Sequence, residues 1–406
     1  EFSIEEVLSA LQSLNPSKTP GPDRLHPKIL KECANELANS LCLIFNKSLR
    51  LGRLPSEWKQ ANITPVFKKG SKILVSNYRQ ISLLCIVSKL CECCILRKIL
   101  PWIIHLLSSV QHGFVRGRSC VTQLLTFLHD LGASLDAGDE IDVIYLDFSK
   151  AFDSVPHGKL LHKLSLFGIQ GPLHAWFTDY LNSRTQRVVI DGTFSSWVPV
   201  TSGVPQGSIL GPFLFLLYVN DLPDILSSST AIALFADDAK CSKVVRNPDD
   251  CVALQHDLNL LTNWSNEWGL SFNSNKCEIL RISRKKRSLL DSPIDIPYTI
   301  NNHPLALAPS SKDLGVWVND KLTWSPQISS VVAKANKTLG FLYRHFGSSY
   351  IGPAQRKLLY LSLVRSHLSY ASEIWAPQSC ITDLKQLENV QRRATRFILS
   401  CSRDPN

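Results

Sequence analysis

An apolar run that ends in two adjacent carboxylates constrains this chain more than any other stretch. Residues Ala231 to Ala236 are mostly apolar, Asp237-Asp238 follow at once, and Val244-Val245 come after a short mixed run. The pattern predicts a β-hairpin with the two acids at its tip. Adjacent carboxylates repel each other unless a cation lies between them, so the pair indicates a divalent metal site. On its own, an aspartate pair is also typical of a solvated turn.

A third acid follows the strongest strand pattern in the first half of the chain. Ile141 to Leu146 is an apolar run with β-branched residues, and it ends at Asp147. The alternative reading is an aspartate that caps the next turn. If this strand lies beside the one that leads to Asp237 and Asp238, three carboxylates converge. Such a cluster can hold two divalent cations about 3.5–4 Å apart, the arrangement used in phosphoryl transfer.

Charge points to a polyanionic partner. The 406 residues include 44 Lys and Arg against 34 Asp and Glu, and the pI is near 9.0. Nucleic acid and an acidic membrane surface both fit this balance. We expect no membrane-spanning segment, because the longest apolar run, Ile209 to Val219, is short and contains Gly211-Pro212.

Cysteine and methionine usage suggest the setting of the protein. The twelve cysteines are scattered through apolar runs, which predicts a reduced, intracellular protein. The stretch Cys91-Glu92-Cys93-Cys94 lacks a second Cys or His pair at zinc-site spacing, so we interpret it as core. Because the chain has no methionine, we expect it to be an internal segment of a longer protein.

Basic residues gather in three segments that could contact phosphates, although for the hairpin among them a solvated charged turn is an equally good explanation. The segments are a predicted hairpin over 61–83, a glycine-containing loop over 111–119, and predicted helices over 329–343, 354–368 and 382–399. Their candidate contact residues are, in that order, Lys68, Lys69 and Arg79; Arg116 and Arg118; and Lys334, Arg392 and Arg393.

Two further loops are candidates for chemistry. The breaker-rich stretch Ser202 to Pro212 opens an apolar helix and places Gln206 and Gly207 at the start of that helix, or it is a tight connection without chemistry. A predicted strand pair brackets 273–276 and places Lys276 at a turn. Helices are also expected over 4–14, 27–51, 86–99, 119–135, 157–166 and 173–182, a strand over 314–318, and a domain boundary within 288–311.

Three motifs together resemble the reverse transcriptases of non-LTR, LINE-type retrotransposons of the jockey group. They are Tyr145 to Asp153, Ser202 to Pro212 and Phe235 to Asp238. Their order and spacing match the family, and the resemblance runs from about Pro20 to Thr395. It implies an α+β right-hand polymerase, with an N-terminal extension and fingers over 1–140, a palm with an antiparallel sheet over 141–320, a thumb of helices over 321–406, and the reverse transcriptase domain at about 60–320.

The resemblance also assigns roles. It implies that Asp147, Asp237 and Asp238 are the catalytic metal ligands, that Lys276 protonates the departing pyrophosphate, and that Leu314 to Val318 belongs to a primer-grip sheet. The nucleotide-binding residues would be Lys68, Lys69, Arg79, Phe152, Gln206 and Gly207. Phe152 would be a steric gate against the ribose 2′-hydroxyl, with a core aromatic as the alternative.

The implied activity is RNA-directed DNA synthesis with two Mg²⁺ ions, or Mn²⁺ in their place. The partners would be an RNA template, a DNA primer and dNTPs, with an endonuclease expected upstream and both cytoplasm and nucleus as locations of the full element protein. The chain departs from the family at Gln80, Val115 and Ala239. These departures motivate the alternative of a catalytically inactive or domesticated nucleic-acid-binding relic; a cellular maturase or telomerase-like polymerase is a lesser one.

Overall fold

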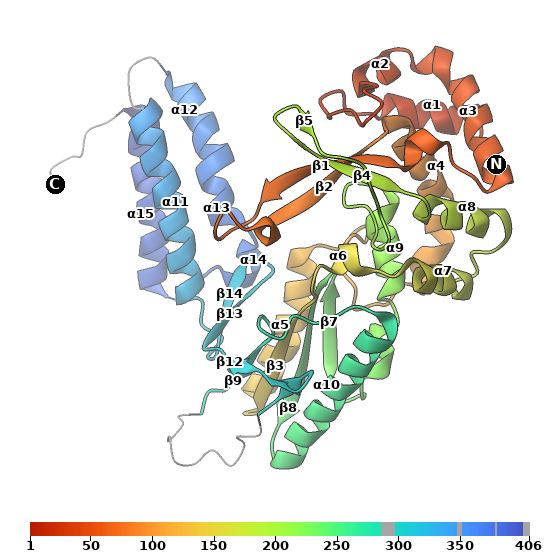
Figure 1. The fold of residues 1–406 in the computed structure, drawn as a ribbon. Helices are drawn as coiled ribbons and strands as arrows, with labels where there is room; N and C mark the ends of the chain where they lie inside the picture. The colour runs from red at the N-terminus through yellow and green to blue at the C-terminus, as the bar shows by residue number, and fades with distance from the viewer. Residues whose placement is uncertain (286–296, 347–350, 378–379, 401–406) are drawn as a thin grey trace.

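A five-stranded sheet forms the centre of the computed structural model, which describes residues 1–285, 297–346, 351–377 and 380–400 (Figure 1). Its strand order is β12-β9-β3-β8-β7. Strand β3 is antiparallel to both β9 and β8, and β8 is antiparallel to β7, whereas the short edge strand β12 is parallel to β9. The strand bounds are β3 Glu140–Asp147, β7 Ala231–Phe235, β8 Asp238–Val245, β9 Glu278–Ile282 and β12 Ala306–Leu307.

Alternation along β3 explains why both faces of this sheet are covered. Ile141 and Val143 pack with residues of helix α5 (Cys120–Asp136) on one face. Ile144 and Leu146 point to the other face and join the largest core, which includes residues of α10 (Pro248–Trp268). Asp147 is separated from Ile141 and Val143 by an even number of residues along β3, so its side chain projects to the same face, which α5 covers.

A second sheet lies above the central one in Figure 1 and carries the predicted basic hairpin. Its strands are β1 Gln60–Phe67, β2 Tyr78–Leu84, β4 Thr185–Ile190, β5 Thr193–Phe194 and β6 Val198–Pro199. The β1–β2 hairpin is antiparallel, whereas β1 and β4 are parallel, so segments far apart in sequence share this sheet. The predicted hairpin over 61–83 is confirmed.

The helices that lie beside the second sheet in Figure 1 pack together in the largest core. The predicted helix over 27–51 is divided at Cys33, whose ψ of 27° ends the first helix and starts the next. Nothing in the sequence at Cys33 explains this break. The bounds are α1 Ile4–Gln12, α2 Pro27–Glu32, α3 Ala34–Leu51, α4 Ile86–Ile103, α6 Ala151–Ser154, α7 His157–Leu166, α8 Gly171–Leu181 and α9 Leu210–Tyr218.

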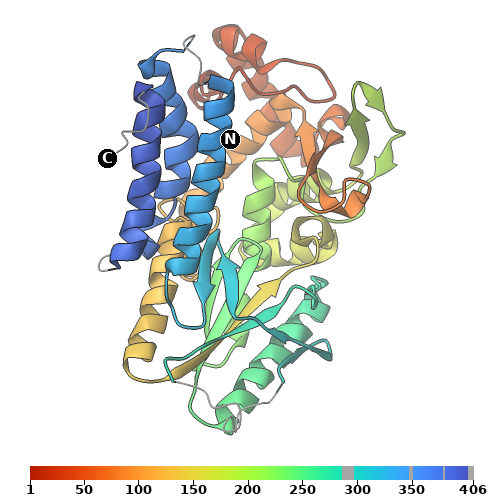
Figure 2. The ribbon, with the colours of Figure 1, turned by 90° about the vertical axis from the view of Figure 1, so that its left-hand side faces the viewer.

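The C-terminal helices stand beside the two sheets (Figure 2). They have a small core of their own, which includes Leu339, Leu342, Val390 and Phe397. The long helices predicted here are present, although the second is interrupted by a π-helical turn at Tyr360–Val364. The bounds are α11 Ser325–Phe346, α12 Pro353–Leu359, α13 Arg365–Ser369, α14 Ser372–Trp375 and α15 Ile381–Leu399.

Two expectations for 270–320 need correction. Leu314 does not begin a strand, because Leu314 and Gly315 have positive φ and form the turn between β13 (Ser310–Asp313) and β14 (Val316–Asn319). Only one strand, β9, flanks 273–276; on the other side Phe272 forms a single bridge to Phe148. The expected boundary over 288–311 lies partly outside the described residues, and the described part forms β10 (Thr299–Ile300), β11 (His303–Pro304), β12 and β13.

The structure also bears on two predictions that were made from composition. Among the described helices, none is both long enough and apolar enough to cross a bilayer. The segment around Cys91 lies inside α4, with Cys91 and Cys94 buried, which agrees with the core interpretation.

Glu92, in the same segment, is completely buried and connects α4 to the start of α9. Its carboxylate Oε2 accepts hydrogen bonds from the backbone N–H of Ile209 at 2.8 Å and of Leu210 at 3.1 Å. These N–H groups have no partner within the helix, so the carboxylate caps α9. Burial raises the pKa of Glu92.

We predict that Glu92→Leu lowers the free energy of unfolding by about 2–4 kcal/mol, because it leaves two buried N–H groups unpaired. Glu92→Gln keeps an acceptor and should lose about half as much. Urea unfolding followed by tryptophan fluorescence measures both, with Glu36→Gln on the exposed face of α3 as the control. A Glu92→Leu variant as stable as the parent would contradict the capping role.

Candidate active site

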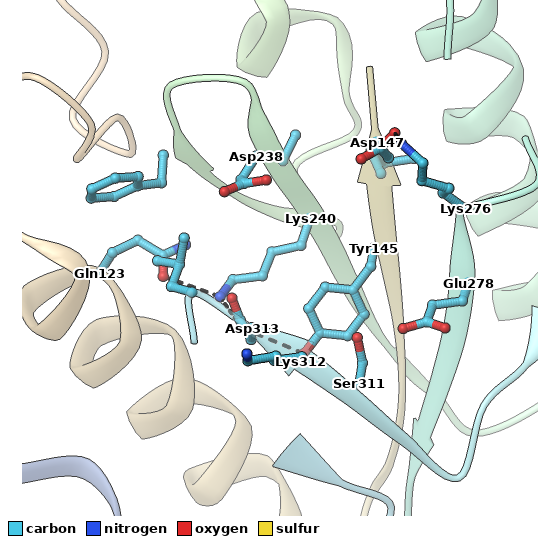
Figure 3. Close-up of a pocket in the computed structure, with 14 residues that line it drawn as sticks. Gln123, Tyr145, Asp147, Asp238, Lys240, Lys276, Glu278, Ser311, Lys312 and Asp313 are labelled. Atoms are coloured by element: carbon cyan, nitrogen blue, oxygen red, sulfur yellow. Dashed lines mark hydrogen bonds and ion pairs between the residues drawn. The ribbon is translucent and has the colours of Figure 1, made fainter. Parts of the chain in front are cut away.

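Asp147 and Asp238 face each other across the two central strands. Asp147 is the last residue of β3, Asp238 is the first residue of β8, and the two are paired in the antiparallel register. Directly opposed residues of antiparallel strands project to the same face of the sheet. Figure 3 shows both carboxylates at the upper edge of one pocket. The strands that carry Asp147 and Asp238 are therefore neighbours in one sheet, as the convergence of the acids requires.

The turn that carries Asp237 is held by a segment that is distant in sequence. Ala236 adopts a left-handed conformation, with φ of 57°. The side-chain oxygen of Gln111 accepts hydrogen bonds from the backbone N–H of Ala236 at 2.9 Å and of Gly113 at 2.8 Å. A Cβ on Gly113 would lie 2.3 Å from the nitrogen of Ala236, so only glycine fits. Gln111 and Gly113 thus position the acidic turn, a role that the sequence analysis did not predict.

The two adjacent acids repel each other, as their spacing predicts. Their side chains reach solvent, but protein atoms crowd around them. This partial desolvation, together with the charges of Asp237, Asp313 and Asp147, raises the pKa of Asp238 to about 6. Desolvation also raises the pKa of Asp237. A cation at this edge would relieve the repulsion.

In this conformation the positive charge next to Asp147 is a lysine. The ammonium of Lys276 lies 2.9 Å from Oδ2 of Asp147. The turn before Lys276 is attached to the same strand end, because the N–H of Asn273 donates to the carbonyl of Asp147 at 2.7 Å. The structure thus brings together Lys276 and Asp147, both predicted from the sequence.

The three acids share one edge of the sheet but are not gathered as ligands. Among the described residues, no group of three His, Cys, Asp or Glu side chains is close enough to hold a metal ion. Their chemistry nevertheless fits one, since carboxylate oxygens are the donors that Mg²⁺ and Mn²⁺ prefer.

The basic hairpin of the second sheet acts on the acidic turn. The charges of Arg79 and Lys68 favour the ionised form of Asp237 and so oppose the rise of its pKa. Both side chains are exposed, and so is Lys69. A ligand with negative charge could therefore lie between this hairpin and the acids.

The loop with Gln206 and Gly207 lies between strand β2 and helix α6. The carbonyl of Gln206 accepts from the N–H of Ser82 on β2 at 2.7 Å, and its side-chain amide donates to Asp153 at 3.1 Å. Gly207 has φ of 124°, and a Cβ there would lie 2.4 Å from the oxygen of Ser82. The loop is thus tightly packed, as the alternative of a tight connection expects, and a contact of Gln206 and Gly207 with a nucleotide stays a prediction.

Phe152 lies next to this loop and is half-buried. Its ring stacks on Phe215 of α9 with centroids 4.5 Å apart and meets Phe114 edge-on at 6.4 Å. Its carbonyl accepts from the N–H of Val204 at 2.7 Å. Both readings of Phe152, as a gate and as a packing residue, are compatible with this position.

The basic side chains predicted to contact phosphates differ in their exposure and in their hydrogen bonds within the chain. Arg118 donates to the carbonyls of Ser109 at 2.9 Å and Gln111 at 2.5 Å, so it orders its own loop. Its contact with nucleic acid stays a prediction. The other four are exposed: Arg116, Lys334, Arg392, which pairs with Glu388, and Arg393, which donates to Asn336.

A buried lysine lies directly below Asp238 (Figure 3). Lys240 contacts the carboxylate of Asp313 and donates to Gln123 at 3.1 Å. Burial lowers the pKa of Lys240. These residues help to line a pocket of about 170 Å³ that also includes Asp147 and Asp238. The sequence analysis missed this pair, although a lysine two residues after Asp238 on the same strand face is a signal that could have revealed it.

The raised pKa of Asp238 predicts a stability effect. The group binds its proton more tightly in the folded chain than in the unfolded one, so stability falls as pH rises from about 4 to 6. Without metal, Asp238→Asn should therefore stabilise the chain at pH 8 by about 1 kcal/mol after allowance for solvent screening, and the gain should vanish below pH 4. Thermal unfolding in EDTA at both pH values measures this effect.

Asp130→Asn, an exposed position on α5, is the control for the loss of one carboxylate. An Asp238→Asn variant less stable than its parent at pH 8 would mean that the carboxylate is stabilising rather than repelled.

Comparison with known proteins identifies the family. A family model described as reverse transcriptase (RNA-dependent DNA polymerase) matches residues 66–339. The probable RNA-directed DNA polymerase from transposon X-element of Drosophila melanogaster is 27% identical over 98% of this chain and 44% of its own length. The RNA-directed DNA polymerase from mobile element jockey of Drosophila funebris is 29% identical over the same shares.

The Drosophila melanogaster jockey polymerase is 29% identical over 81% of this chain and 36% of its own length. The chain thus spans less than half the length of these curated relatives. The resemblance to LINE-type retrotransposon proteins is confirmed. The family model covers the hairpin with Lys68 and Arg79, the strands with Asp147 and Asp238, and the turn with Lys276, and this chain belongs to the reverse transcriptase family.

Proposed function

We propose that this chain is the polymerase of a non-LTR retrotransposon and copies an RNA template into DNA. The observation that carries the proposal is the pairing of Asp147 with Asp238 across β3 and β8, with Asp237 in the adjoining turn. Family membership supports it, because the acids, the hairpin cations and the glycine-rich loop all belong to the matched region.

The architecture is that of a right hand. The fingers comprise residues 1–140 together with the β4–β6 hairpin, the palm comprises 141–320 with the central sheet, and the thumb comprises 321–406. The separate core of the C-terminal helices supports the last division. The site then lies in the palm, between the basic hairpin of the fingers and the β13–β14 hairpin.

Asp147, Asp237 and Asp238 would hold two Mg²⁺ ions, or Mn²⁺ in their place. When bound, such ions activate the attacking hydroxyl and stabilise the departing phosphate oxygens. Reverse transcriptases generally use divalent cations. Desolvation and the neighbouring negative charges together raise the pKa of Asp238, and a divalent cation would stabilise its ionised form.

The remaining residues bind and orient the substrates. Lys68, Lys69 and Arg79 bind the triphosphate by charge, Gln206 and Gly207 contact the nucleotide and the template, and Phe152 excludes a ribose 2′-hydroxyl. Lys276 gives a proton to the departing pyrophosphate. Catalysis in such a site is mostly positioning and electrostatic stabilisation. Arg116, Arg118, Lys334, Arg392 and Arg393 bind the backbone of the RNA template and DNA primer.

The full element protein would carry an endonuclease upstream and would act in the cytoplasm and the nucleus. The departures at Gln80, Val115 and Ala239 do not remove any of the three acids. An inactive relic of the same fold is therefore not favoured, and the first experiment below separates it from the enzyme.

We predict that the 406-residue chain extends a DNA primer on an RNA template with Mg²⁺. Three separate variants should each lose at least about 100-fold in the rate of extension, because each removes one negative charge from the metal site. They are Asp147→Asn, Asp237→Asn and Asp238→Asn. Gel-based primer extension measures this, with Asp130→Asn as the control. A folded parent that binds primer–template but extends nothing would support the relic instead.

A second prediction concerns the sugar. Phe152→Val should raise the use of rNTPs relative to dNTPs by about 10–100-fold, because a smaller side chain no longer crowds the 2′-hydroxyl. The matched control is Phe215→Leu, which removes the stacking partner and keeps Phe152. If Phe152 only packs the core, both variants will lose stability and neither will change the ratio of rates with the two sugars.

A further inference from the structure

The buried pair of Lys240 and Asp313 lies between the catalytic strand and the β13–β14 hairpin. We propose that the two are positioning residues, which fix this hairpin against the strand of Asp238 and thereby set the place of the primer end. The inference rests on the proposed function, since it names the part of that site which orients one substrate.

Lys240 is enclosed on several sides. It follows Asp238 by two residues on β8, so both side chains project to the same face of the sheet. It is 2% exposed, its ammonium donates to Oε1 of Gln123 at 3.1 Å, and it lies 4.2 Å from the ring centroid of Phe127. Gln123 and Phe127 both belong to α5, so this helix holds the ammonium of Lys240 independently of the β13–β14 hairpin.

Asp313 brings the hairpin to this ammonium. It is the last residue of β13, is 5% exposed, and contacts Lys240 directly. It also accepts from the hydroxyl of Tyr145 at 3.4 Å. Tyr145 is the residue opposite Lys240 in the β3–β8 register. One carboxylate therefore links the hairpin to both strands that end in catalytic acids.

The rest of the hairpin is attached farther from the acids. Val318 packs into the core between the central sheet and α5, and the N–H of Ser283 donates to the carbonyl of Asp320 at 3.0 Å. These contacts hold the hairpin to the sheet. Its end nearest Asp238 is held by the pair and by the hydroxyl of Tyr370, which donates to the carbonyl of Leu314 at 2.7 Å. An apolar contact would tolerate sliding, but an ion pair with further hydrogen bonds has a defined direction.

A stabilising role alone does not account for the pair. Burying two charges removes them from water, and well-packed apolar residues usually stabilise a core as well or better. What the pair adds is a defined position for the β13–β14 turn. Ser311, Lys312 and Leu314 line the pocket together with Asp147 and Asp238 (Figure 3).

The two acids of the turn face different surroundings, which indicates the substrate concerned. Asp237 is influenced by Arg79 and Lys68 of the fingers hairpin, the cations assigned to the triphosphate. Asp238 is adjacent to Lys240 and Asp313. The β13–β14 hairpin, which includes Leu314 to Val318 of the primer-grip sheet that the resemblance implies, then lies on the primer side of the site, and the fingers hairpin lies on the nucleotide side.

The test replaces the pair by apolar residues of similar size, Lys240→Met with Asp313→Leu, in the 406-residue chain. This variant should raise the KM for primer–template by about 10-fold, because a displaced hairpin contacts the primer end less well, and leave the KM for dNTP within about two-fold. Asp313→Asn, which keeps an acceptor for Lys240 and Tyr145, should show a smaller rise and serves if the double variant does not fold.

The matched control is the buried pair at the other end of the same sheet, Arg281 with Asp142, whose Nη2 and Oδ2 lie 2.8 Å apart. Arg281→Met with Asp142→Leu removes a comparable pair away from the pocket and should leave both KM values unchanged. Equal changes in the two double variants, or no rise for Lys240→Met with Asp313→Leu, would overturn the proposal.

Hydrogen exchange tests the docking of the β13–β14 hairpin independently of whether the chain has polymerase activity. Amides of 310–319 should exchange faster in Lys240→Met with Asp313→Leu than in the parent, while amides of β3 and β9 keep their protection. If the parent extends no primer, the proposed function fails, and exchange still decides whether the pair docks the hairpin. Unchanged exchange over 310–319 would overturn the docking role.

Discussion

The antiparallel register of β3 and β8 is the constraint on which the rest of the site depends. It places Asp147 opposite Asp238 and Tyr145 opposite Lys240. A shift by one residue would send these side chains to the opposite face of the sheet, into the core with α10. Register is fixed because both faces are buried, by Ile141 and Val143 on one side and Ile144 on the other.

The site carries charge that the fold must compensate. Two adjacent acids repel each other, and a third stands across from them. In this conformation the compensation comes from lysines: Lys276 on Asp147, and Lys240 below Asp238. Such local conflict with stability is typical of functional sites, where residues are retained for chemistry rather than for folding. The positively charged fingers hairpin and the acids together provide the setting in which a nucleotide with its metal ions would be neutralised.

Sequence patterns predicted the parts of the site that local chemistry determines. Strand β3 ends at Asp147 because an apolar run with β-branched residues stops there, and the β1–β2 hairpin presents Lys68 and Arg79 because its two strand patterns flank a breaker-rich tip. The three- and four-residue spacing of Leu254, Leu258 and Leu261 likewise indicates helix α10, and Gly269 after it is a left-handed cap.

Contacts between distant segments were not predictable in this way. No local pattern indicates that Gln111 holds the turn at Ala236, or that Glu92 caps α9 from more than 100 residues away. The turn at Leu314 was misread as strand because its apolar neighbours hide the positive φ. Likewise, no local pattern indicates that the guanidinium of Arg118 donates to the backbone carbonyls of Ser109 and Gln111. In each of these cases the tertiary partner, and not the local sequence, decides the role.

The central claim is that this strand pairing makes a cation site from Asp147, Asp237 and Asp238. The most direct measurement is a crystal structure with primer–template, a dNTP and Mn²⁺, in which anomalous scattering locates the ions. The account predicts Mn²⁺ bound by these carboxylates, with the Lys276 ammonium moved away from Asp147. Mn²⁺ bound elsewhere, with the Lys276–Asp147 ion pair still at the 2.9 Å seen here, would contradict it.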